Sequence, residues 1–252
     1  MGAFRLTIAY DGTPFAGWAA QPGLRTVQGE IEAALERIVG ERVPLTVAGR
    51  TDAGVHAWGQ VASFSLEGEA PDNLGQRLNA LLPSAIAVVE AAPAPDGFDA
   101  RGDARSRTYC YWVLASPVRD PFLDGKALWW PHRVERAGLE RCAAALTGSH
   151  DFTAFTPTQT EHVRFEREVI QAEWRAHPLT PPFAGELLEF WIEADAFMRH
   201  MVRTLVGTML EVAGGRRAHE DFESLLRGAP RERAGDTTPA HGLYLAAVRY
   251  RR

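Results

Sequence analysis

The spacing of apolar and polar residues predicts alternating strands and helices from the start of the chain. The β-rich run from Phe4 to Tyr10 predicts a strand that ends at the turn dipeptide Asp11-Gly12. Apolar residues then recur with the 3.6-residue period of a helix that begins at Thr26 and is closed by Gly40. A second helix is expected with Pro71 in its first turn. Further strands are predicted over residues 45–48, 60–66 and 85–89.

The second half of the chain repeats this alternation. The proline- and glycine-containing stretch Ala91 to Asp103 is the best linker candidate, so we divide the chain into an N-terminal half, 1–103, and a C-terminal half, 104–252. Interleaved strands and helices without a repeat of 20–50 residues indicate an α/β or α+β protein of two halves. The elements predicted in the C-terminal half are strands at 108–114, 163–174, 186–194 and 242–250 and helices at 136–146, 197–212 and 220–226.

Composition indicates a globular protein. The 252 residues are 46% hydrophobic, too many for a disordered chain. No apolar stretch approaches the ~20 residues of a membrane helix, and the first ten residues lack the pattern of a signal peptide. Cys110 and Cys142 form neither a CxxC pair nor a disulfide framework, so they are expected to be reduced thiols of a cytoplasmic protein.

The formal net charge of −5 argues weakly against a nucleic-acid partner. However, Lys126 is the only lysine, and all other cations are arginines, which bind phosphate with two parallel hydrogen bonds or stack on a base. Their distribution is uneven. Residues 199–217 carry four arginines and one acid, whereas residues 67–99 carry six acids and one arginine.

Metal and nucleotide-phosphate motifs do not occur in the sequence. The eight histidines form no HxxxH pair and have no zinc-finger spacing with the cysteines. There is no GxxxxGK[ST] loop, no GxGxxG after a strand and no GxSxG elbow.

The segment Ala48 to His56 is the strongest candidate for chemistry. Asp52 follows a predicted strand and lies between two glycines that permit close approach of backbone or ligand. If the chain is extended there, Arg50 and Asp52 face the same side, and the guanidinium keeps the carboxylate ionised, as a nucleophile requires. The alternative is that Asp52 caps its own turn and pairs with Arg50 on the surface.

Two further segments carry clustered arginines. Strand alternation from Arg105 to Tyr111 puts Arg105, Arg107, Tyr109 and Tyr111 on one face, which suits phosphate contact and base stacking. The alternative is an exposed strand face with half-buried tyrosines. In the helix predicted from Phe197, the methionines belong to a core stripe, and Arg199 and Arg203 share another face that binds phosphate or is simply solvated.

Taken together, these motifs resemble the TruA family of tRNA pseudouridine synthases along nearly the whole chain. The strings GRTDAGVH, HMVR and GLYL in this order make the resemblance highly specific. The segments that carry it are Tyr10–Trp18, Thr26–Gln28, Ala48–His56, Phe98–Arg101, Gly148–Phe155, His200–Arg203 and Gly242–Leu245.

The resemblance implies an α+β pseudouridine synthase fold, with two halves sharing an extended, mostly antiparallel sheet and a central active-site cleft. It implies Asp52 as the catalytic residue, Arg50 and Arg203 as its partners, Tyr109 against the target uracil and Leu245 in substrate binding. It also implies a cytoplasmic homodimer that needs no cofactor and no metal. The substrates would be uridines 38, 39 and 40 of the tRNA anticodon stem-loop. Expected contacts to the RNA backbone are Arg105, Arg107, Arg199, Arg216 and Arg217.

Three points stay open at this stage. Asp52 acts as a nucleophile at C1′ or C6, or as a base that drives elimination at the sugar. A non-catalytic tRNA-binding protein on the same scaffold is the first alternative function. An unrelated Asp-dependent hydrolase, with Arg50 binding a small acidic substrate, is the second.

Overall fold

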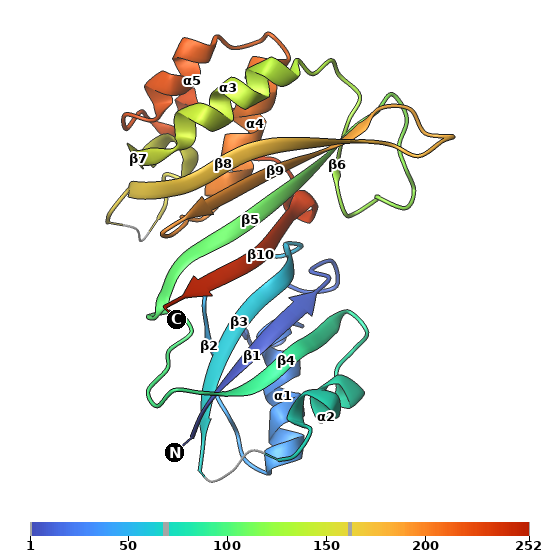
Figure 1. Cartoon of the computed structure of the whole chain (residues 1–252), viewed down its shortest axis with the longest axis vertical. Coiled ribbons are helices and arrows are strands. Elements are labelled where there is room, and N and C mark those ends of the chain that lie inside the picture. The colour runs from blue at the N-terminus through green and yellow to red at the C-terminus, as the bar shows by residue number, and fades with distance from the viewer. Residues whose placement is uncertain (1, 68–70, 161–162, 252) are drawn as a thin grey trace. The chain divides into compact units, whose positions relative to one another are not determined.

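The chain divides into two units in the computed structural model, which describes residues 2–67, 71–160 and 163–251 (Figure 1). Unit 1 runs up to Arg105 and includes the chain from Tyr244 onward, and unit 2 is Ser106–Leu243. The predicted halves therefore differ from the units at the C-terminal strand. Part of the acidic stretch 67–99, residues 68–70, lies outside the described residues, as do the two chain ends.

Unit 1 is built on a sheet with the strand order β4-β1-β3-β10, and β2 pairs with β3. β1 runs antiparallel to both β3 and β4, whereas β10 runs parallel to β3 through the pairs Tyr244–His56 and Leu245–Ala57. This pairing puts β10 in unit 1. The strands are β1 (Gly2–Tyr10), β2 (Thr46–Val47), β3 (His56–Leu66), β4 (Ile86–Ala94) and β10 (Leu243–Tyr250).

Helix α1 (Val27–Val39) confirms the prediction made from its end signals. The Thr26 side chain accepts a hydrogen bond from the backbone N–H of Gly29 (3.3 Å), so it caps the helix start. Gly40 ends the helix in the left-handed conformation, with φ 90°. The helix buries its apolar positions Val27, Ile31, Ala34 and Leu35.

Two other predictions in unit 1 are wrong. Helix α2 (Leu74–Leu81) begins after Asn73. Asn73 has φ 57°, a left-handed conformation that a right-handed helix excludes, so the helix cannot extend back to Pro71. The expected linker from Ala91 onward begins as strand, because β4 continues to Ala94 and pairs with Ala3. Pro93 is tolerated there because β4 is an edge strand, where a missing N–H leaves no neighbouring carbonyl unpaired.

In unit 2 the strand order is β5-β9-β8-β7, and helices α3, α4 and α5 lie together on one side of these strands (Figure 1). Phe152, Phe155, Phe190 and Phe222 are fully buried in its core. The strands are β5 (Ala104–Ala115), β6 (Leu128–Trp130), β7 (Gly148–Asp151), β8 (Glu166–Pro178) and β9 (Glu186–Ala194). The helices are α3 (Arg136–Leu146), α4 (Met201–Ala213) and α5 (His219–Leu225), with short 3₁₀ turns at Thr153–Phe155, Arg231–Arg233 and Ala240–Gly242.

Helix α4 begins four residues later than predicted. His200 has φ 63°, which interrupts the right-handed helix, so Arg199 lies in a turn before it. The prediction that Arg199 and Arg203 share a helix face is therefore wrong. The predicted core stripe is confirmed, because Met198, Met201, Val202, Leu205, Val206, Met209 and Leu210 are all buried.

Mixed helices and mostly antiparallel strands confirm the α+β class. Among the pairings of named strands that are described within each unit, β3–β10 and β5–β6 are parallel and the others are antiparallel. In the described part of the chain, no helix combines the length and apolar character that a membrane span needs.

Candidate active site

Asp52 lies in the loop between β2 and β3. Its backbone carbonyl accepts a hydrogen bond from the N–H of Val55 (3.1 Å), which closes a turn that contains Gly54 at φ 78°. The loop bends at residues 48–49 and turns at residues 53–54, on either side of the stretch from Arg50 to Asp52, so the shared facing of Arg50 and Asp52 stays a prediction. Asp52 is half-buried, its neighbour Thr51 is buried and Arg50 is exposed. The Asp52 side chain therefore extends from a backbone whose preceding residue, Thr51, is buried.

A chain of side-chain hydrogen bonds anchors this loop. The Gln60 amide donates to the carbonyl of Gly49 (2.8 Å) and to the Tyr10 hydroxyl oxygen (3.3 Å). The Tyr10 and Thr51 hydroxyl oxygens are 2.7 Å apart. Burial raises the pKa of Tyr10 to about 12, so the phenol keeps its proton at neutral pH, and either hydroxyl can be the donor in this bond. Gln60, Tyr10 and Thr51 therefore fix both the start of the loop and the residue before Asp52.

Two glycines of the segment Tyr10–Trp18 allow the backbone to approach the Asp52 loop closely. A Cβ on Gly12 would stand 2.1 Å from the carbonyl oxygen of Val55, and one on Gly17 would stand 2.9 Å from that of Thr51. The N–H of Trp18 donates to the same Thr51 carbonyl (3.0 Å). No side chain fits at Gly12 without displacing backbone, so the opening motif and the Asp52 loop depend on each other.

His56, at the end of the loop, is buried and stacks on Tyr244 with 4.7 Å between ring centroids. Its Nδ1 is 3.0 Å from the N–H of Gly12 and 3.1 Å from Asp11 Oδ1. One nitrogen cannot accept from the first and donate to the second at once. Asp11 Oδ1 already accepts bonds from the N–H and hydroxyl of Thr13 (3.0 and 2.7 Å), whereas the Gly12 N–H is a buried donor. We therefore assign Nδ1 as the acceptor in a neutral imidazole.

The structure places Leu245 on β10, paired with Ala57, one step beyond the stacked His56 and Tyr244. Its side chain is fully buried. Tyr244 also stacks on Trp58, with ring centroids 4.4 Å apart. The sequence motifs did not single out these aromatic contacts, although their members lie within or beside GRTDAGVH and GLYL.

In unit 2, Tyr109 lies on β5 with 8% of its surface exposed, and its ring packs edge-on against Phe197 at 4.9 Å. Phe197 is an addition to the predicted site residues. Tyr111 is fully buried and donates to the carbonyl of Pro239 (2.8 Å), so the prediction that its strand face is open to RNA is wrong at this residue. Arg107 is half-buried and donates to the carbonyl of Asp195 (3.0 Å).

Arg203 is held on α4 by the segment that follows α5. Its Nε donates to the carbonyl of Thr238 (2.6 Å), and the Thr238 hydroxyl donates back to the carbonyl of Arg203 (2.9 Å). Burial is the main cause of a lowered pKa at His241, and the positive charge of Arg203 contributes to it. His241 is therefore a neighbour of Arg203 that the sequence motifs did not indicate.

The remaining predicted arginines differ in their surroundings. Arg105 and Arg199 are exposed. Arg216 is exposed as well, and its guanidinium lies 5.8 Å from the centroid of the Trp130 ring. Arg217 is half-buried, and both its Nε and Nη2 lie 2.9 Å from Glu211 Oε2. Arg217 is thus already neutralised within the protein.

The predicted site residues fall into two sets. Arg50, Asp52 and Leu245 belong to unit 1, while Tyr109 and Arg203 belong to unit 2. Within the described residues, no group of three or more His, Cys, Asp or Glu side chains is arranged to hold a metal ion.

Comparison with known proteins identifies the family. A model of the tRNA pseudouridine synthase family matches residues 6–101 and 142–251. The chain belongs to this family. It is therefore an isomerase, and its substrate is tRNA. The match includes the Asp52 loop, Arg203 and the β10 strand.

Relatives of the chain extend over almost its full length. It is 43% identical to tRNA pseudouridine synthase A of Frankia casuarinae over 98% of this chain and 88% of that protein. It is 39% identical to the protein of the same name from Moorella thermoacetica, over 99% and 100% of the two chains. The corresponding figures for a Geobacillus species are 37% identity, 98% and 97%. The predicted pseudouridine synthase fold is confirmed by this membership.

Proposed function

We propose that the enzyme converts uridines 38, 39 and 40 of the tRNA anticodon stem-loop to pseudouridine. In this isomerisation the N1–C1′ bond breaks, the uracil turns, and a C5–C1′ bond forms. C5 loses its hydrogen as a proton and N1 gains one, so the reaction needs no redox partner. The resemblance of GRTDAGVH, HMVR and GLYL to the TruA family supports these positions over other uridines.

Asp52 is the proposed catalytic residue. The observation that carries this assignment is the fixed backbone before it, where Thr51 is bonded by Tyr10 and Trp18 while Asp52 remains half-buried and accessible. Such preorganisation holds a reacting group in position before substrate arrives. The carboxylate attacks C1′ or C6, or acts as the base that drives elimination at the sugar. Arg50 and Arg203 are proposed to balance its charge.

Tyr109 is proposed to contact the target uracil. A base inside a stem cannot be reached, so it must be turned out of the stack at a cost of roughly a few kcal/mol. Tyr109 is suited to receive such a base, because its ring is braced edge-on by Phe197 (4.9 Å) and needs no reorientation. Leu245 is also proposed to bind substrate, which requires its fully buried side chain to become accessible. Arg105, Arg107, Arg199 and Arg216 are proposed to contact phosphates of the tRNA.

Release of the C5 hydrogen from tRNA transcripts with C5-tritiated uridine tests the proposal. Wild type should release it from the anticodon stem-loop, and mapping should place the product at positions 38–40. Asp52→Asn should bind the transcript and release no label. Asp96→Asn, the same change at an exposed site of unit 1, is the matched control and should react like wild type.

Two outcomes would contradict the proposal. Turnover by Asp52→Asn would refute the catalytic assignment. Release of label by wild type from uridines outside positions 38–40 would refute the proposed positions.

We also propose that the enzyme is a cytoplasmic homodimer, on the strength of the same resemblance. Sedimentation equilibrium of the full chain should give twice the mass of one chain, and a single-chain mass at micromolar concentration would exclude a stable dimer. Cell fractionation tests the compartment.

A further inference from the structure

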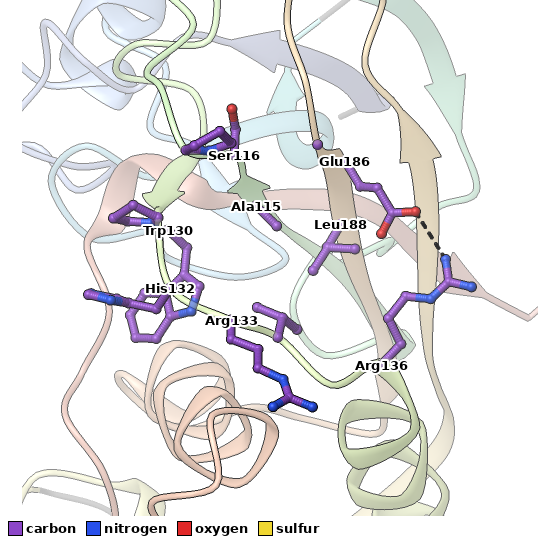
Figure 2. Close-up of a pocket in the computed structure, with 12 residues that line it drawn as sticks. Ala115, Ser116, Trp130, His132, Arg133, Arg136, Glu186 and Leu188 are labelled. Carbon is purple, nitrogen blue, oxygen red and sulfur yellow. Dashed lines mark hydrogen bonds and ion pairs between the residues drawn. The ribbon is translucent and has the colours of Figure 1, made fainter.

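A pocket of about 430 Å³ lies in unit 2, where the ends of β5, β6 and β9 meet the segment that leads into α3 (Figure 2). Its lining residues lie outside the predicted motifs, and Arg216, a predicted RNA contact, lies beside its Trp130. Its volume is within the usual range for pockets that hold a small ligand, roughly 300–1,000 Å³.

The pocket combines an apolar wall with a basic rim. Ala115, Leu188 and Val134 contribute apolar surface, and Trp130 contributes an aromatic ring. His132, Arg133 and Arg136 lie at the rim and are exposed (Figure 2). Arg136 forms an ion pair with Glu186 (3.2 Å), the acidic side chain among the lining residues. Arg133 therefore adds positive charge beyond the Arg136–Glu186 pair.

Trp130 has cationic and imidazole neighbours. The guanidinium of Arg216 lies 5.8 Å from its ring centroid. The His132 ring packs edge-on against it, with centroids 5.0 Å apart and an interplanar angle of 79°. Arg216 thus brings a positive charge to the Trp130 ring, and Arg133 adds another among the residues that line the pocket, an arrangement that suits an aromatic ligand carrying negative charge.

Backbone and side-chain bonds hold these residues in place. Trp130 pairs with Ala115 in the β5–β6 ladder. The indole N–H of Trp129 donates to the carbonyl of Ser116 (3.0 Å), and the N–H of Glu135 donates to the carbonyl of Ala213 at the end of α4 (2.9 Å). The segment between β6 and α3 is thus fixed at both ends, and the pocket is formed before a ligand binds.

We propose that this pocket binds one unpaired nucleotide of the tRNA substrate. The base packs against Trp130 and the apolar wall, while Arg133 and Arg216 contact its phosphate or the adjacent one. Unpaired RNA bases bind in this way on aromatic rings and guanidinium planes, whereas a duplex backbone needs no apolar wall. The inference rests on the proposed function, because it assigns a second contact on the same tRNA.

The first test compares two exposed arginines of unit 2 by measuring tRNA affinity. Arg133→Gln should raise Kd for the transcript about threefold to tenfold and reduce the slope of log Kd against log salt by about one. Arg141→Gln removes the same charge from α3 at a position that does not line the pocket. It should leave Kd and slope as in wild type.

The second test addresses the stacking role of Trp130. Trp130→Phe keeps an aromatic ring and should retain affinity within about twofold, whereas Trp130→Leu should weaken binding at least as much as Arg133→Gln. Thermal unfolding of both variants is measured in parallel. Because the Arg133 side chain is exposed, Arg133→Gln still tests the proposal if Trp130→Leu fails to fold.

The outcomes separate this inference from the proposed function. If wild type releases label from the transcript but Arg133→Gln and Trp130→Leu bind it with wild-type Kd, the pocket assignment is overturned and the enzymatic function stands. If wild type neither binds nor converts tRNA, the proposed function itself fails. Equal weakening by Arg133→Gln and Arg141→Gln also overturns the assignment, since it indicates a general effect of charge.

Discussion

The hydroxyl of Tyr10 on β1 lies 2.7 Å from the hydroxyl of Thr51, the residue immediately before Asp52. Both side chains are buried. The bond joins the first strand to the candidate catalytic loop across 41 positions of sequence. This bond matters for function because the position of Thr51 sets the position of the Asp52 backbone, from which the carboxylate extends.

Tyr10→Phe removes this bond and leaves the Thr51 hydroxyl without its partner. The loss should lower the free energy of unfolding by about 1–2 kcal/mol, as expected for a buried hydrogen bond. It should also lower kcat about tenfold to a hundredfold, because a small displacement of a catalytic group is costly. Urea unfolding and the tritium-release assay measure the two effects.

Tyr250→Phe is the matched control. The Tyr250 hydroxyl donates to the carbonyl of Ala100 (2.8 Å), so this variant removes one half-buried bond from the same unit that involves neither Thr51 nor Asp52. We expect a similar or smaller loss of stability and an unchanged kcat. Equal kcat values for the Tyr10 and Tyr250 variants would contradict the positioning role of Tyr10.

Local signals predicted the elements whose boundaries are decided by neighbouring residues. Thr26 and Gly40 mark the two ends of α1, and both perform the capping that their positions imply. The bounds of α3 and β9 also match the prediction. For α1 the agreement has a local cause, because the residues at its two ends supply the start and stop signals.

Features that depend on residues far apart in the sequence could not be predicted from the local pattern of polarity. Nothing local to His200 indicates its φ of 63°, which moves the start of α4 and removes Arg199 from the helix. The burial of Tyr111 depends on Pro239, 128 positions away, and the strand alternation could not show it. The residue Asp52 was found from sequence, but its support by Tyr10 and Gln60 requires the pairing of β1 with β3.

Gly12→Ala should be strongly destabilising. The added Cβ would stand 2.1 Å from a backbone oxygen of Val55, so the loop that follows Asp52 must move. We expect a loss of about 3 kcal/mol or more in the free energy of unfolding, at the upper end of overpacking effects. Chemical denaturation measures the loss, and any folded enzyme should show reduced kcat.

Gly75→Ala provides the comparison within unit 1. Its added Cβ would meet the Ala91 side chain at 3.5 Å, which is ordinary contact, and Gly75 lies in α2. Alanine favours helix over glycine, so this variant should be as stable as wild type or up to about 1 kcal/mol more stable. Similar destabilisation by both substitutions would show that the contact at Gly12 is not the cause.

Tyr111→Phe separates a core role from an RNA-binding role. The Tyr111 hydroxyl donates to Pro239, and a Cβ on Gly242 would stand 2.6 Å from its ring, so the side chain is tightly enclosed. We expect the variant to lose about 1–2 kcal/mol of stability while Kd for tRNA stays unchanged. Weaker tRNA binding at unaltered stability would instead support the strand-face prediction for Tyr111.

Alkaline pH should destabilise the fold through Tyr10. Below pH 10 the phenol is protonated in both the folded and the unfolded chain. Because burial raises its pKa to about 12, only the unfolded chain loses this proton between pH 10 and 12. The free energy of unfolding therefore falls across that window, by roughly 2–3 kcal/mol from this group.

Urea midpoints at pH 9, 10.5 and 11.5 measure this dependence. Cys142, whose pKa burial raises to about 12, contributes to the decline in wild type and in Tyr10→Phe alike. The difference between the two proteins therefore isolates Tyr10, and it should shrink as the pH rises. A constant difference from pH 9 to 11.5 would contradict the raised pKa.

The affinity for tRNA should fall steeply with salt although the net charge is −5. Counterion release depends on the phosphates contacted, and each contact contributes roughly 0.7–0.9 to the slope of log affinity against log salt. Arg199 is exposed, so Arg199→Gln should reduce this slope by about that amount. Filter binding at salt concentrations from about 50 to about 200 mM measures this slope.

Arg217→Gln is the informative comparison, because Arg217 already shares its charge with Glu211 at 2.9 Å. Its removal should change the slope less than removal of Arg199, and it should cost stability by leaving Glu211 without that partner. An affinity that does not respond to salt would rule out the arginine contacts altogether. Equal slope changes in the two variants would show that RNA displaces Glu211 from Arg217, since only a guanidinium released from its carboxylate can neutralise a phosphate.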